Sequence, residues 1–84
     1  MSSEGSPVSG RSAEKLVYMA NQIGKFFASQ DAERAPAAIS EHLQKFWDPR
    51  MRAGIIAHFE AGGAGLDPLV RQAVERLREA TPAR

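Results

Sequence analysis

The chain has 84 residues, no cysteine and a net charge of +1. This length allows one small domain, which buries only about 60% of its unfolded surface and is marginally stable alone. The lack of cysteine excludes a disulfide framework and thiolate metal sites, and the nearly neutral charge is unlike the strong basic excess typical of nucleic-acid binders.

The N-terminal segment, residues 1–11, is rich in Ser, Gly and Pro and has little to bury beyond Val8. We expect it to be a disordered tail. It lacks the charged region and apolar run of a secretory signal, and no later run approaches the roughly 20 apolar residues that span a bilayer. We therefore expect a cytoplasmic protein. Given its length and the expected tail, residues 12–81 should form a single helical domain.

The first helix is expected over about residues 13–29, with Ser12 as its N-cap. At 3.6 residues per turn, one face carries six apolar residues: Leu16, Met19, Ala20, Ile23, Phe26 and Phe27. Tyr18 and Lys25 lie on the opposite face. Gly24 costs about 1 kcal/mol relative to Ala inside a helix, and it would allow another helix to approach closely.

The second helix is expected to begin near Pro36, although Ala35 is a weak cap. Its apolar stripe has four members, with His42 at the edge: Ile39, Leu43, Phe46 and Trp47. The helix should end before Asp48-Pro49, because the residue before a proline is pushed out of the helical region. Asp48 and Pro49 then serve as the N-cap and first position of the third helix.

The third helix has a central stripe with His58 and Ile56 on its flanks: Met51, Ile55 and Phe59. The glycine-rich residues 61–65 end it, and Asp67-Pro68 repeats the helix-start signal. The fourth helix has one apolar face: Leu69, Val70, Ala73, Val74, Leu77 and Ala80. No segment alternates with period two. The predicted fold is therefore all-α, a small bundle of three to four short amphipathic helices or an open pair of helical hairpins.

No group of residues indicates catalytic chemistry. Residues 61–65 lack the preceding strand and the lysine or serine of a phosphate-binding loop. His42 and His58 lack metal-site spacing and a third ligand, and they flank apolar stripes, so packing or interface roles are favoured. No Ser, Asp and His spacing suggests a nucleophile with its base. We expect no catalytic, cofactor-binding or metal-binding residue in this chain, which is then not an enzyme by itself.

The corner at residues 45–52 combines the only Trp of the chain with three basic residues. Trp47 and its basic neighbours could belong to the core, could contact a nucleic acid, or could anchor a protein partner, since Trp and Arg are typical anchors. Arg52 falls inside the apolar sector of the third helix, where a guanidinium needs a carboxylate, backbone carbonyls or a route to water. A larger partner could supply those acceptors. We favour core plus protein interface.

Several blocks resemble the formate dehydrogenase delta-subunit family: KLVYMANQI at 15–23, Phe26-Phe27, HLQKFWDPRMR at 42–52 and GLDPLV at 65–70. The MANQI and KFW-x-PRMR parts are the specific ones. Together the resemblance reaches from about residue 15 to residue 77. Members of this family are small accessory subunits of soluble, NAD-dependent formate dehydrogenases that contain molybdenum or tungsten.

The resemblance implies a non-catalytic subunit of a complex that oxidises formate to carbon dioxide and reduces NAD. In that family a large subunit carries the molybdenum or tungsten bis-pterin cofactor and iron–sulfur clusters, and other subunits carry FMN and the NAD site. The delta chain is expected to bind no cofactor itself. It is expected to bind the large subunit and to support assembly, stability or cofactor insertion.

The resemblance supplies no residue roles, so the expected interface rests on physical argument. The corner residues are Phe46, Trp47, Asp48, Arg50, Met51 and Arg52. A second candidate patch lies on the first helix, outside its core-facing side, and consists of Tyr18, Asn21, Gln22 and Lys25. Two alternatives stay open: a chaperone that visits the large subunit transiently, and a stand-alone helical module that binds nucleic acid through the corner at 45–52.

Overall fold

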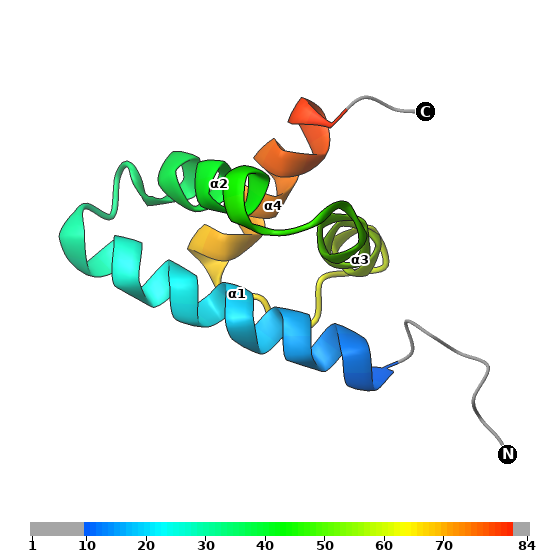
Figure 1. Cartoon of the computed structure of the whole chain (residues 1–84). Helices are drawn as coiled ribbons and strands as arrows, with labels where there is room; N and C mark the ends of the chain where they lie inside the picture. The colour runs from blue at the N-terminus through cyan, green and yellow to red at the C-terminus, as the bar shows by residue number, and fades with distance from the viewer. Residues whose placement is uncertain (1–9, 82–84) are drawn as a thin grey trace, which may run out of the picture.

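Four helices make up the computed structural model, which describes residues 10–81 (Figure 1). Their bounds are α1 Gly10–Gln30, α2 Ala35–Phe46, α3 Pro49–Glu60 and α4 Pro68–Ala80. The described residues contain no strand, and the all-α prediction is confirmed.

The first helix begins earlier than expected. Gly10 and Arg11, assigned to the tail, are the first residues of α1, and Ser12 lies within the helix rather than capping it. One more turn costs little here, because arginine and serine are only slightly less favourable than alanine in helices. The rest of the expected tail, residues 1–9, lies outside the described residues.

The long helix α1 packs against all three others, and the most extensive pairing in the bundle joins α2 to α4. In Figure 1, α2 lies over the C-terminal half of α1, and α3 lies near its N-terminal half. The contact between α1 and α4 is close at Gly24, where an added Cβ atom would collide with Val70. The proposed role of Gly24 in helix packing is therefore confirmed.

The core combines one large aromatic side chain, Trp47 at the end of α2, with small and branched side chains from all four helices and the last loop. Its members are Ala20, Ala35, Ile39, Leu43, Trp47, Ile55, Leu66, Val70, Ala73, Val74 and Leu77. The expected apolar faces of α3 and α4 supply buried Ile55 and Val70, with partly buried residues beside them. Ala80, placed on the apolar face of α4, is exposed in its last turn.

Two phenylalanines expected in the core lie mostly outside it. Phe26 is 58% exposed and Phe46 is 71% exposed. Phe26 lies about 120° around α1 from buried Ala20, at 100° per residue, which is the edge of the core-facing arc. Trp47, rather than its neighbour Phe46, enters the core, because the helix ends there and its extended backbone (φ −88°, ψ 138°) turns the indole inward.

The two Asp-Pro starts differ in how they cap their helices. Asp48 Oδ1 accepts the backbone N–H of Met51 at 2.8 Å, as expected of an N-cap. Asp67 has the backbone conformation of an N-cap, but its side chain makes no capping hydrogen bond. The loop before it turns through Gly62, Gly63 and Gly65, which all have positive φ. That conformation favours glycine, and it confirms the helix-terminating role of this stretch.

Candidate partner-binding site

The corner between α2 and α3 is held together by Arg52. Its Nη1 donates to the backbone carbonyl of Gln44 at 3.2 Å and to the carbonyl of Trp47. These carbonyls belong to the last turn of α2 and to its C-cap residue, where carbonyl acceptors lack partners within the helix. The chain's own backbone carbonyls thus serve as the acceptors that a larger partner could also have supplied. Trp47 is 5% exposed and belongs to the core.

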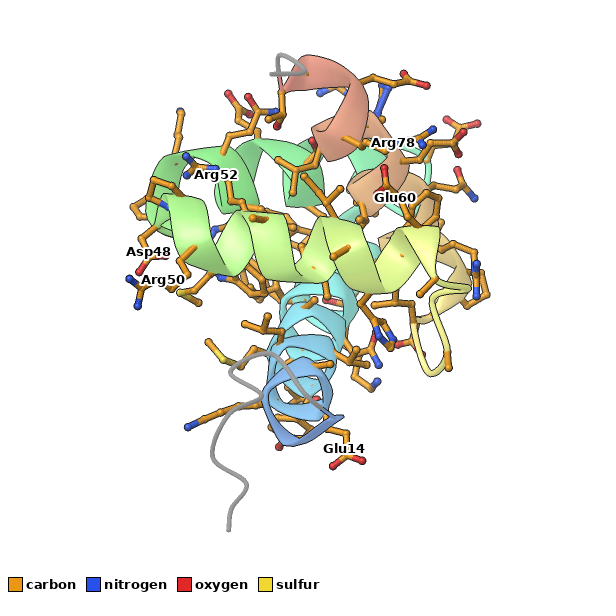
Figure 2. All side chains as sticks on the ribbon, turned by 90° about the vertical axis from the view of Figure 1, so that its right-hand side faces the viewer. Glu14, Asp48, Arg50, Arg52, Glu60 and Arg78 are labelled. Atoms are coloured by element: carbon orange, nitrogen blue, oxygen red, sulfur yellow. The ribbon has the colours of Figure 1, made fainter. Side chains whose placement is uncertain are left out.

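Other corner residues do face outward. Figure 2 shows Arg52 reaching from α3 toward α2, whereas Arg50 points away from the helices at the same end of α3. Phe46 and Asp48 are also exposed, and Met51 is half-buried. The corner therefore presents Phe46 and Arg50 to a partner, with Asp48 occupied as a cap. The indole needed for stacking a nucleic-acid base is buried, so nothing here supports that alternative.

The second expected patch is largely engaged within the chain. Asn21 Nδ2 donates to the carbonyl of Gly65 at 2.9 Å, and its Oδ1 accepts the N–H of Asp67 at 3.0 Å. Lys25 forms an ion pair with the Asp67 carboxylate at 3.3 Å. Of this patch, only exposed Tyr18 and Gln22 have no hydrogen bond or ion pair among the side-chain contacts described.

A groove of about 760 Å³ lies between α1, the second half of α3 and the following loop. Its lining is mostly small: Ala13, Val17, Gly54, Ala57, Ala61, Ala64 and Gly65, with Glu14, Tyr18, Asn21 and His58. The polar groups here are partly satisfied, because His58 Nε2 donates to the Ala64 carbonyl at 2.8 Å. The groove offers shape and apolar surface, but no converging set of reactive groups.

The described residues also lack the features of a metal site. Between residues 10 and 81, no three His, Asp or Glu side chains gather closely enough to hold a metal ion. Among residues 13–81, no buried side-chain nitrogen or oxygen lacks a hydrogen-bond partner. None of the four described helices has the length and hydropathy needed to cross a bilayer. The exposed large apolar side chains that remain, Tyr18, Phe26 and Phe46, are of the aromatic kind that is enriched at protein interfaces.

Sequence reasoning missed a row of aromatic side chains across α1 and α2, which we call the aromatic ridge. It consists of Phe26, Phe27, His42 and Phe46, whose neighbouring ring centroids are 5.2, 5.9 and 4.8 Å apart. Phe27 and His42 are half-buried, and the two end rings are the exposed ones. The position of Phe26 at the edge of the helical arc was the signal available in the sequence.

Comparison with known protein families identifies the family of this chain. Residues 15–74 match the family model described as NADH-dependent formate dehydrogenase delta subunit FdsD. The chain belongs to the FdsD family. The matched range runs from the first half of α1 into α4, so it includes parts of all four helices. No curated protein and no solved structure gives a significant match.

The blocks that carry the resemblance to FdsD meet in the structure. The Asn21 side chain, from the MANQI block, forms hydrogen bonds with the backbone of Gly65 and Asp67, which belong to the GLDPLV block. The KFWDPRMR block forms the corner closed by Arg52. Of the expected interface residues, Asn21 and Arg52 are therefore engaged in joining parts of the chain to one another.

Proposed function

We propose that this chain is a non-catalytic subunit of a cytoplasmic NAD-dependent formate dehydrogenase complex, in which it binds the large molybdenum- or tungsten-cofactor subunit. The observation that carries the proposal is the FdsD family match over residues 15–74. In this proposal the delta chain contributes to assembly, stability or cofactor insertion. The bis-pterin cofactor, iron–sulfur clusters, FMN and the NAD site belong to partner subunits, and this chain binds none of them.

The proposed mechanism is mutual stabilisation through binding. A helical domain of this size is marginally stable, and a partner that binds only its folded form stabilises it by mass action. The large subunit is stabilised in the same way if the delta chain binds its folded form and not its unfolded form. We place the contact at the outward residues of the α2–α3 corner, above all Phe46 and Arg50, because exposed aromatic and arginine side chains are typical interface anchors.

The proposal is tested by affinity purification of the tagged chain from its native cell extract. The bound fraction is assayed for formate-dependent NAD reduction and for molybdenum and tungsten. Both should co-elute with the chain after washing. Elution of the chain alone, with all formate dehydrogenase activity in the unbound fraction, would contradict a stable subunit role.

A further inference from the structure

The aromatic ridge is a connected surface rather than a set of scattered side chains. Phe26 on α1 and Phe46 on α2 are joined through Phe27 and His42, with edge-to-face or tilted ring contacts at every step. Single exposed apolar residues are normal on protein surfaces. A continuous row that bridges two helices is instead the kind of patch that marks an interaction site.

The two outer rings of the ridge have little part in the packing of the isolated chain, whereas Phe27 packs against the core. Phe26 and Phe46 are 58% and 71% exposed, and neither belongs to the core cluster. The inner rings, Phe27 and His42, are half-buried and hold the outer rings in place from beneath. A rigidly supported pair of exposed rings loses little side-chain freedom when a partner covers it, which favours binding.

The area of the ridge argues against a second copy of this chain as its occupant. An aromatic side chain has roughly 150–250 Å² of surface, so the two outer rings expose roughly 200–300 Å² together. A symmetric dimer through the ridge alone would bury only about twice that area, well below the roughly 1,200 Å² of stable specific interfaces. The ridge is therefore large enough for one anchor within a wider contact to a bigger protein.

The charges beside the ridge indicate what that protein presents. Phe46 ends α2, and Arg50 lies just across the corner in the first turn of α3. Arg50 is exposed and has no ion pair among residues 13–81. Lys45, next to Phe46, forms an ion pair with its helix neighbour Glu41, and both side chains are more than 60% exposed. An unneutralised guanidinium at the end of an apolar surface is complementary to a carboxylate.

We propose that the aromatic ridge docks an apolar segment of the large subunit that carries an Asp or Glu positioned to pair with Arg50. This inference rests on the proposed function and adds the surface and the chemistry of its partner. In this proposal the partner's apolar side chains cover Phe26 and Phe46, which His42 connects through its ring contacts with Phe27 and Phe46. The groove between α1 and α3, where Tyr18 is exposed, is the rival docking surface.

The test compares four variants of the tagged full-length chain, expressed in cells that contain the complex. The ridge variant is Phe26→Gln with Phe46→Gln, and the charge variant is Arg50→Glu. Arg76→Glu is the matched control, because Arg76 is exposed on α4 beside the start of α2, where none of the ridge residues lies. Arg76 also has no ion pair among the described residues. Tyr18→Gln probes the rival groove. Large-subunit capture is measured by formate-dependent NAD reduction in the bound fraction.

The ridge variant should lower capture at least about tenfold, the effect of losing a hot-spot anchor. Arg50→Glu should lower it several-fold, with a weaker dependence on salt than the wild type shows, and Arg76→Glu should leave it unchanged. Far-UV circular dichroism establishes whether each variant is folded. If the ridge variant is not folded, Arg50→Glu provides the test, because the Arg50 side chain has no ion pair among residues 13–81.

Three results would overturn the inference. If a folded ridge variant or Arg50→Glu captures as much large subunit as the wild type does, the ridge is not the docking surface, and the proposed function still stands. If Tyr18→Gln loses capture of the large subunit and the ridge variants do not, the groove between α1 and α3 is the docking surface instead of the ridge. Failure of the wild-type chain itself to capture activity refutes the proposed function, and the ridge inference falls with it.

Discussion

Replacing Arg52 with methionine should destabilise the isolated chain far more than the same replacement at Arg50. The Arg52 guanidinium donates to the carbonyls of Gln44 and Trp47 at the end of α2. A hydrogen bond from a charged donor contributes about 1.5–3 kcal/mol. Since one nitrogen serves both carbonyls and the residue is half-exposed, we take the pair as worth about 2 kcal/mol.

Methionine keeps most of the apolar stem, so the change isolates the guanidinium. For a domain of this size, 1 kcal/mol shifts the unfolding midpoint by roughly 4–8 °C. Arg52→Met should therefore lower the midpoint by roughly 8–16 °C, while Arg50→Met, whose side chain is exposed, should change it by less than about 2 °C.

The assay is thermal unfolding followed by circular dichroism at 222 nm, with both variants measured beside the wild type. Equal midpoints for the two variants would refute the closing role assigned to Arg52. If Arg52→Met left the midpoint unchanged but abolished large-subunit capture, Arg52 would be a partner anchor, as the sequence first suggested, rather than an internal clamp.

Four further substitutions test other contacts between helices and other helix starts by the same assay. Asn21→Leu should lower the free energy of unfolding by about 1–2 kcal/mol, because it leaves the N–H of Asp67 without its acceptor. An unfolding midpoint equal to that of the wild type would mean that this hydrogen bond is not formed. Asp48→Ala should cost about 1 kcal/mol as a lost N-cap, whereas Asp67→Ala should cost less than about 0.5 kcal/mol, since its side chain only forms an exposed ion pair. The reverse order would contradict the cap assignment. Gly24→Val should cost about 1–3 kcal/mol through collision with Val70, and a stable variant would show that α1 and α4 are not in close contact.

The sequence predicted the helices well where local chemistry specifies an end. The Asp48-Pro49 and Asp67-Pro68 pairs begin α3 and α4, and the three positive-φ glycines lie in the predicted terminating stretch. These signals act within a few residues, so they can be read without knowledge of the tertiary fold. The start of α1 carries only weak preferences, and it was placed three residues late.

The candidate site was harder to predict because it depends on contacts between helices. Helical periodicity placed Phe46 and Trp47 in one stripe, but only the fold shows that the chain leaves the helix at Trp47 and turns this side chain inward. The partners of Arg52 are carbonyls eight and five residues away across a bend. Those of Asn21 are more than 40 residues away in sequence. Such long-range pairings carry no local signal.

The central claim, that this FdsD-family chain is a subunit of a formate dehydrogenase, is tested most directly from the side of the enzyme. The complex should be purified through a tag on its large subunit and separated by size. Quantitative mass spectrometry would then measure this chain across the peak of formate-dependent NAD reduction. We predict a constant ratio of this chain to the large subunit through the whole active peak. Full activity in fractions that lack the chain would contradict the account.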